Sequence, residues 1–271
     1  MWELWFTTPR VALWCSSRGS KPLVVPVNGC MNEWLTRALL ASAEGLPEEA
    51  EGYMLGRGLP CALASEMGVG VWHPPQEQCP DSTFSTRYGP TGHRVEGWIS
   101  VPMWSPRGRL LGVEFRRWDG EKGSQKFYLP DSRWLPVFTG MVPSTLNRIW
   151  NGGDVWLVEG LFDLAVAHVI PAKDVSWGNG GAKITYNQLT FLKRFLSPSA
   201  WVHVCFDMDE TGQNMAKGFA HPETGKRVWG VTERLQRVGI KARTVQYRGG
   251  KDPGELWEER GNEGLRHALA L

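Results

Sequence analysis

The stretch "VWLVEGLFDLAVAHVI" (155–170) decides how the second half of the sequence is interpreted. Four apolar residues lead directly to Glu159, a glycine follows, and Asp163 stands four residues after the glutamate. The apolar run predicts a buried strand over 154–160, and residues 162–170 are expected to form a helix. The sequence thus places a carboxylate at the end of a buried strand, and this position requires a chemical explanation.

Strands and helices keep alternating from there to the last residue. Further strands are predicted at 174–178, 200–207 and 241–247. Helices are predicted at 185–196, directly after 207–212, and at 228–239, 253–261 and 262–271. Short strands separated by helices form βαβ units and a mostly parallel sheet. Residues 151–271 are therefore interpreted as an α/β domain that ends in helices.

The preceding residues have a different pattern. Residues 49–66 predict two short helices separated by Gly58 and Pro60, and the Pro-, Gly- and Ser-rich residues 73–94 predict a loop. Short β runs follow at 98–104, 110–118 and 126–130. We interpret 49–150 as a small basic α+β subdomain containing a β meander. Residues 1–48 are an uncertain N-terminal segment, in which 31–45 has helical spacing.

The net charge of the 271 residues is only +2, but the charges are unevenly distributed. Residues 98–150 contain eight Lys or Arg against four Asp or Glu, whereas residues 1–97 contain seven against ten. The basic excess is therefore concentrated in the middle of the chain. A basic surface of this kind suits the phosphates of a nucleic acid.

The composition argues against a secreted, membrane-bound or zinc-binding protein. The five cysteines form no CxxC pair, so neither a zinc ribbon nor a disulfide framework is predicted. No stretch reaches the roughly 18 apolar residues of a membrane span, and the N-terminus lacks a basic-then-apolar export signal. We therefore expect no zinc, no membrane partner and a cytoplasmic location.

Carboxylates follow two of the predicted strands at the points where ligands gather in an open α/β sheet. Glu159 ends one strand, and Asp207 and Asp209 end another. If the two strands are neighbours, three like charges converge and need a counter-cation. Hard oxygen ligands suit Mg²⁺, which favours phosphoryl or nucleotidyl transfer. The alternative for an aspartate just before a helix is an N-cap, and this applies to Asp209.

Five stretches, which follow one another in the same order as in the family, resemble the TOPRIM primases of bacteria and phages. "EGLFD" (159–163) and "FDMDETGQNMA" (206–216) resemble the TOPRIM domain of primases, topoisomerases and some nucleases, where one strand ends in Glu-Gly and a later one in Asp-x-Asp. "GGKDPGELWEERG" (249–261) is similar to the Gly-x-Asp-Pro-Asp-Glu segment of the bacterial replicative primase. "GYMLGRGLP" (52–60) and "PRGRLLGVEFRRW" (106–118) resemble upstream primase segments, so the resemblance covers about 50–271.

The resemblance implies three groups of site residues and Mg²⁺ or Mn²⁺ as the cofactor. The catalytic acids expected to hold the metal ions are Glu159, Asp207 and Asp209. The acids expected to support them near the metals are Asp163 and Asp252. The residues expected to bind template, primer or nucleotide are Arg116, Arg117, Lys126, the weaker candidate Arg57, and Gly178, whose glycine turn either approaches a phosphate or is an ordinary turn.

The sequence departs from the primase pattern at several places. Gly254 stands where the pattern has an aspartate, so one acid is missing unless Glu255 replaces it. The segment "HPETGKR" (221–227) interrupts the helix after Asp209 and is interpreted as an insertion. Residues 1–48 lack the zinc ribbon of bacterial primases, and no helicase-binding domain follows the last helix. A separate replicative helicase is therefore an expected partner.

These features favour a primase that joins ribonucleoside triphosphates on a single-stranded DNA template. Two alternatives stay open at this point. A TOPRIM nuclease would use the same acids to cut DNA, although the primase-like flanking motifs disfavour it. A non-catalytic single-strand-binding module, descended from a primase and weakened at Gly254, would bind without turnover.

Overall fold

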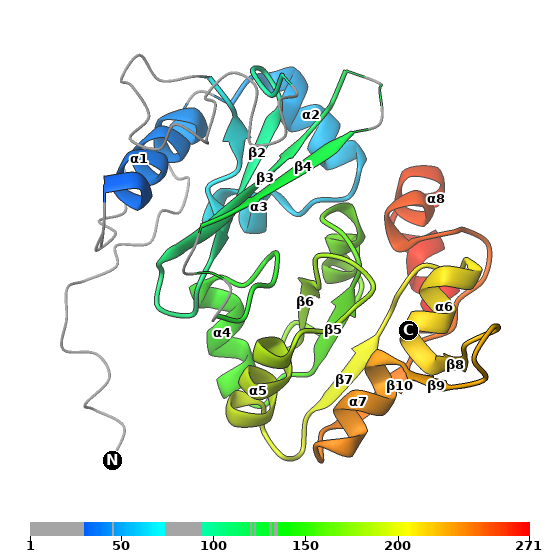
Figure 1. The fold of residues 1–271 in the computed structure, drawn as a ribbon. Coiled ribbons are helices and arrows are strands. Elements are labelled where there is room, and N and C mark those ends of the chain that lie inside the picture. The colour runs from blue at the N-terminus through cyan, green and yellow to red at the C-terminus, as the bar shows by residue number, and fades with distance from the viewer. Residues whose placement is uncertain are drawn as a thin grey trace.

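The computed structural model describes residues 30–44, 46–73, 94–119, 121, 123–129, 132 and 135–271. Most of the N-terminal segment and nearly all of the predicted loop at 73–94 lie outside these ranges. Two sheets with their helices make up most of the described chain, one from each half of the sequence (Figure 1). No helix within the described ranges is long and apolar enough to cross a membrane.

The N-terminal subdomain consists of an antiparallel sheet and three helices. Its sheet has the order β1-β2-β3-β4, and this confirms the predicted meander. The strands are β1 (Gly70–Val71), β2 (Ile99–Trp104), β3 (Leu110–Arg116) and β4 (Ser124–Tyr128). The helices are α1 (Cys30–Glu44), α2 (Glu48–Gly56) and α3 (Cys61–Met67). Strand β1 is short and was not predicted from the sequence.

Gly58 lies between α2 and α3, where the chain approaches the second half of the molecule. Its φ angle is +78°, and a Cβ there would lie 2.6 Å from both Ala165 and the ring of Trp257. Only glycine combines this backbone conformation with so close a contact. The break between the two predicted helices is therefore also a contact between the two halves of the protein.

The second half is a parallel sheet with the order β10-β7-β5-β6. Its strands are β5 (Val155–Val158), β6 (Val175–Gly178), β7 (Trp201–Val204) and β10 (Lys241–Thr244). Its helices are α4 (Pro143–Trp150), α5 (Tyr186–Phe195), α6 (Glu210–Lys217), α7 (Val231–Arg237) and α8 (Pro253–Leu269). Strands β5 and β7 are hydrogen-bonded neighbours, which is the condition under which their terminal carboxylates converge.

Three elements differ in detail from the sequence prediction. Residues Phe162–His168 form a 3₁₀ helix, η3, where a longer helix was expected; the Asp163 carboxylate accepts a hydrogen bond from the Gly160 amide and tightens this turn. The two predicted C-terminal helices are one element, α8, broken at Gly261 by a φ of 61° and a ψ of −159°. The expected insertion at 221–227 lies in a hairpin of β8 (Gly218–Ala220) and β9 (Arg227–Trp229), so the helix predicted from residue 228 begins only at Val231.

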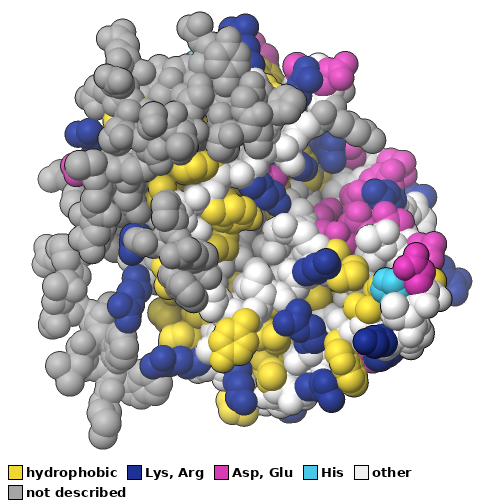
Figure 2. All heavy atoms as spheres, in the orientation of Figure 1, with side chains coloured by type: hydrophobic (Ala, Val, Ile, Leu, Met, Phe, Trp, Pro, Cys, Tyr) yellow, Lys and Arg dark blue, Asp and Glu magenta, His cyan; other side chains and the backbone are white. Residues whose placement is uncertain are grey.

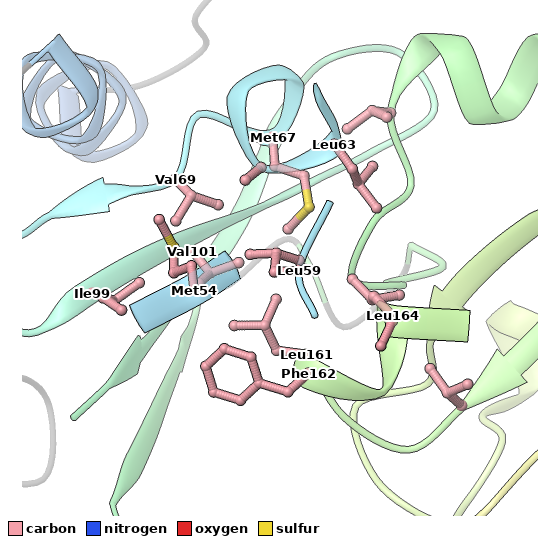
Figure 3. Packing of buried hydrophobic residues seen from close by; sticks show 14 of the residues in the cluster. Met54, Leu59, Leu63, Met67, Val69, Ile99, Val101, Leu161, Phe162 and Leu164 are labelled. Carbon is pink, nitrogen blue, oxygen red and sulfur yellow. The ribbon is translucent and has the colours of Figure 1, made fainter. Parts of the chain in front are cut away.

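Two hydrophobic clusters hold the described residues together. One contains residues of both halves, as Figure 3 shows for Leu59 of the N-terminal subdomain beside Leu161 and Phe162 of the parallel-sheet half. The second lies around Trp177 and includes residues of α4. Residues on both sides of the predicted domain boundary, between 150 and 151, therefore pack into the same apolar clusters. The division into domains stays a prediction.

Candidate active site

Acidic side chains gather at the carboxyl end of the parallel sheet. Oxygens of Asp163, Asp207 and Asp252 all lie within 4.8 Å of one another, a geometry suited to a metal ion. The three come from separate elements, because Asp163 belongs to η3, Asp207 follows β7, and Asp252 is the N-cap of α8. Figure 2 shows Asp and Glu side chains gathered toward the right of the view, near α6 and α8.

Asp163 is the most deeply buried member of this cluster, at 7% exposure. Its carboxylate accepts hydrogen bonds from the backbone amides of Gly160 (2.8 Å) and Gly254 (3.4 Å). Burial, followed by the nearby charge of Asp252, raises the pKa of Asp163 to about 7. A buried carboxylate of this kind resists ionisation until a cation is close.

Asp207 lies beside Asp163 and faces a lysine from the loop before α8. Burial and then the charge of Asp252 raise the pKa of Asp207 to about 6, although Lys251 opposes the rise. The Lys251 ammonium lies 3.6 Å from Asp207 Oδ2 and 3.5 Å from Asp209 Oδ2. These aspartates raise the pKa of Lys251, with Asp207 contributing most. The Lys251 ammonium thus neutralises only part of the negative charge of the acidic cluster, and the remaining negative charge favours a further cation.

Glu159 is held against the same strand end as Asp207. Its Oε1 accepts a hydrogen bond from the Asp207 amide at 3.2 Å. Burial and then the Asp207 charge raise the pKa of Glu159 to about 7. Gly212 packs over both residues, since a Cβ there would lie 2.8 Å from Glu159 Oε1 and 2.4 Å from the Asp207 carbonyl oxygen. The glycine is required for this close approach of α6.

Asp209 has the structural role that the sequence left open. It is the N-cap of α6, and its Oδ1 accepts a hydrogen bond from the Gly212 amide at 2.8 Å. This bond lowers the pKa of Asp209. Its other oxygen faces Lys251, and the side chain is 44% exposed. Capping therefore occupies one oxygen and leaves the second at the edge of the acidic cluster.

The structure orders the predicted acids differently from the sequence. The sequence made Glu159, Asp207 and Asp209 the principal acids, whereas Asp163 and Asp252, expected as supporting residues, are the ones that form the tight cluster with Asp207. The donors are all carboxylate oxygens, two of the three have raised pKa values, and an ammonium already lies beside them. This chemistry fits a hard divalent cation.

Gly254 and Glu255 explain how the chain departs from the primase pattern. A Cβ at Gly254 would lie 3.2 Å from the carbonyl group of Phe162, so even a methyl group would require η3 or α8 to shift by a few tenths of an ångström. The Glu255 carboxylate accepts a hydrogen bond from the Lys251 amide in the first turn of α8. Glu255 therefore stabilises the loop, while the acid missing at 254 has no replacement in this arrangement.

Two of the predicted basic residues surround a buried glutamate that the sequence analysis missed. Glu114, at 2% exposure, lies 3.5 Å from Arg116 Nη1 and 3.4 Å from Lys126 Nζ. The Lys126 ammonium also donates a hydrogen bond to the Gly180 carbonyl oxygen at 3.4 Å. Glu114 thus anchors two cations beside the glycine loop. The sequence feature that could have identified Glu114 is its position as the single acidic residue inside the apolar strand "LLGVEF".

The other two predicted arginines have their own partners. Arg57 pairs with Glu258 at 3.3 Å and stacks on the Phe162 ring, with its Cζ 4.7 Å from the ring centre. Arg117 pairs with Asp119 on the surface, and this contact raises the pKa of Arg117. Arg57 therefore lies next to the residue that precedes Asp163, while Arg117 lies over the Trp98 ring, with its Cζ 5.8 Å from the ring centre.

The amides of the glycine loop are used inside the fold. The Gly178 amide donates to the Thr139 carbonyl oxygen at 2.9 Å, and the amides of Asn179 and Gly181 donate to Val158 and Glu159. A Cβ at Gly178 would lie 3.0 Å from Thr139. Of the two interpretations of this turn, the hydrogen bonds of this conformation agree with the ordinary packed turn.

Comparison with known proteins identifies the fold. A family described as Toprim-like matches residues 156–257. The DNA primase of Aquifex aeolicus (strain VF5) is 27% identical over 173 residues, which are 63% of this chain and 32% of that protein. The structure of the Aquifex aeolicus primase with its zinc-binding and RNA polymerase domains aligns with a TM-score of 0.61 and 23% identity, over 87% of this chain and 59% of that one.

The RNA polymerase domain of Mycobacterium tuberculosis primase aligns with a TM-score of 0.60 and 20% identity, over 89% of this chain and 82% of that one. Residues 156–257 therefore resemble the Toprim-like class of domains, and the acidic cluster lies at the carboxyl end of the parallel sheet in this part of the chain. The chain as a whole has the fold of the primase catalytic core, as the sequence motifs predicted. It spans about a third of the curated relative that it matches.

Proposed function

We propose that this protein is a DNA primase that joins ribonucleoside triphosphates into short RNA primers on single-stranded DNA. The observation that carries the proposal is the cluster of Asp163, Asp207 and Asp252 on a primase-core fold, beside the cations anchored by Glu114. We include Mg²⁺ or Mn²⁺ as the cofactor because all the donors are carboxylate oxygens. A cytoplasmic location, in the host cell if a phage encodes the protein, belongs to the same proposal.

The chain's residues have distinct parts in this proposal. Asp207, Asp163 and Asp252 would hold divalent ions, with Glu159 and Asp209 at the edge of the cluster. When bound, such ions activate a 3′-hydroxyl group and neutralise the leaving pyrophosphate. Glu159, with its pKa raised to about 7, is suited to accept the proton of that hydroxyl group.

The basic residues would bind the nucleic acid and the nucleotide. Lys126 and Arg116 lie on the sheet of the N-terminal subdomain and would contact template phosphates, while Lys251 would contact the triphosphate beside the acids. Among similar structures, a DnaG primase catalytic domain was determined bound to single-stranded DNA, at 15% identity and a TM-score of 0.58. That relative supports the choice of a single-stranded template, and a separate helicase remains the proposed source of that strand.

The test is primer synthesis by the purified protein with a single-stranded template, labelled ribonucleotides and Mg²⁺ or Mn²⁺. We expect the Asp207→Asn, Asp209→Asn double variant to lose at least about a hundredfold in activity, because removing charge from a metal site removes transition-state stabilisation. Glu259→Gln, an exposed carboxylate of α8, is the control and should retain activity. Undiminished synthesis by the double variant, with its fold intact by urea denaturation, would contradict the proposal.

One observation favours a second candidate, a non-catalytic single-strand-binding module. Gly254 removes an acid of the primase pattern, and Glu255 does not replace it. The same assay separates the candidates, because the module would bind single strands in a salt-sensitive way without incorporating nucleotide. Metal-dependent cleavage of the template, without incorporation, would indicate a nuclease.

A further inference from the structure

A second basic surface lies away from the acidic cluster, between α5 and the β8–β9 hairpin. It is a shallow groove of about 550 Å³, and none of its lining residues carries a carboxylate. The lining residues are Leu189, Arg227, Val228, Trp229, Arg234, Arg237 and Val238. Figure 2 shows Lys and Arg side chains interspersed with hydrophobic ones across the lower part of the face, where Figure 1 places α5 and α7.

Trp229 is the exposed aromatic residue of this groove. Its side chain is 44% exposed, and the Arg237 guanidinium lies over it with Cζ 3.7 Å from the ring centre. This contact holds the indole at the surface of the hairpin while the rest of the groove stays open. An exposed ring beside a guanidinium is the pairing on which single-stranded bases stack while their phosphates are neutralised.

The three arginines of the groove differ in whether they have a partner within the protein. Arg227 pairs with Glu233, and Arg234 donates a hydrogen bond from Nη1 to the Ile184 carbonyl oxygen at 2.6 Å. Arg237 has no carboxylate within ion-pair distance among the residues that the structure describes. Glu233 is close enough for the Arg237 charge to contribute to its lowered pKa, but no ion pair occupies the guanidinium, which can still pair with an anionic ligand.

One loop contacts both the groove and the cations that Glu114 anchors. Lys126, beside Glu114, donates a hydrogen bond to the Gly180 carbonyl oxygen, and Arg234 donates to Ile184 in the same loop before α5. The loop therefore has a cation at each end, with Lys126 at Gly180 and Arg234, a residue of the groove, at Ile184. Lys183 lies within the loop and adds a further positive charge to it.

We propose that this groove binds single-stranded DNA, as an extension site for template outside the catalytic cleft. One base stacks on Trp229 and a neighbouring phosphate pairs with Arg237. The choice of template as the strand rests on the proposed function. The hairpin that carries Trp229 contains the segment 221–227, which interrupts the primase pattern, so the site would be a property of this chain.

The experiment compares the affinities of the full protein for a short oligothymidylate of about 8 nucleotides and a long one of about 30, by fluorescence anisotropy. We expect the Trp229→Ala, Arg237→Ala double variant to bind the long oligonucleotide about tenfold more weakly and the short one unchanged. The salt dependence for the long one should fall by about one unit of slope. The control is Trp150→Ala, Lys173→Ala, which removes a 47%-exposed tryptophan and one cation near α4.

Further measurements make the result decisive. The Trp229→Phe, Arg237→Lys variant should restore binding, which excludes misfolding of the alanine variant as the cause. Iodouracil photocrosslinking of the long strand should label Trp229 in the wild-type protein and also in the Asp207→Asn, Asp209→Asn variant, so this test does not depend on catalysis. Equal losses in the control variant, no crosslink at Trp229, or binding of an acidic peptide there in place of DNA would each overturn the proposal.

Discussion

The buried carboxylate of Asp163 gives the protein a stability that depends on pH when no metal is present. The pKa of this group is raised from 3.8 to about 7 by burial and by Asp252. Between these values the folded protein keeps a proton that the unfolded chain has lost. The free energy of unfolding therefore falls as pH rises, by about 1.4 kcal/mol per pH unit for this one group.

The Asp163→Asn substitution removes this contribution while keeping the size of the side chain. Between about pH 5 and about pH 7 the wild-type protein should lose on the order of 3 kcal/mol through Asp163, in addition to what Glu159 and Asp207 contribute. The variant should retain only the contributions of the other acids. Its plot of unfolding free energy against pH should be shallower by about 1.4 kcal/mol per pH unit.

Urea denaturation in EDTA, at several pH values across this range, measures both slopes directly. Asp174→Asn is the matched control, because Asp174 is also buried but lies at the opposite end of the sheet and accepts a hydrogen bond from the Asp154 amide at 2.9 Å. Wild type and Asp163→Asn plots that stay parallel would refute the assignment of a raised pKa to this residue.

Two further substitutions test how the site is built. Gly212→Ala places a methyl group against Glu159 and Asp207, so we expect at least about a tenfold loss of Mg²⁺ affinity by calorimetry. The control is Gly56→Ala, where a Cβ meets no atom within 4 Å. Equal Mg²⁺ affinities of the Gly212→Ala variant and the wild-type protein would contradict the argument. Lys126→Met leaves buried Glu114 paired with Arg116 alone, so it should lower the free energy of unfolding, measured in urea, by about 1–3 kcal/mol. Lys193→Met, on the surface of α5, is the control and should leave the free energy of unfolding unchanged. An unchanged free energy of unfolding in Lys126→Met would contradict the pairing of Lys126 with Glu114.

The sequence predicted helices and strands correctly where the hydrophobic pattern of a segment favoured a single type of secondary structure. The apolar runs before Glu159 and Asp207 predicted β5 and β7, and the β runs before Arg116 predicted the meander. The motifs around these strands also predicted the primase-core fold. The distinction between an α-helix and the 3₁₀ helix η3 was beyond the sequence, because periods of 3.6 and 3.0 cannot be separated over seven residues.

The details of the site depend on contacts between residues far apart in the sequence. Asp163 is buried because the Gly254 amide and Asp252 reach it from the start of α8, about ninety residues later in the chain. Glu114 is paired only because β4 brings Lys126 beside it. The groove at Trp229 depends on the β8–β9 hairpin, whereas the sequence marked only 221–227 as an insertion and placed Trp229 in a predicted helix at 228–239.

The tight contact at Gly58 has a consequence for the proposed primer synthesis. Ala165 and Trp257 leave no room for a methyl group there, and a single apolar core continues across the same junction. The cations of β3 and β4 and the acids of the parallel sheet are therefore held on one packed framework. If the protein is the primase proposed above, each nucleotide addition would shift the hybrid duplex along a fixed surface, and translocation would depend on releasing and regaining phosphate contacts.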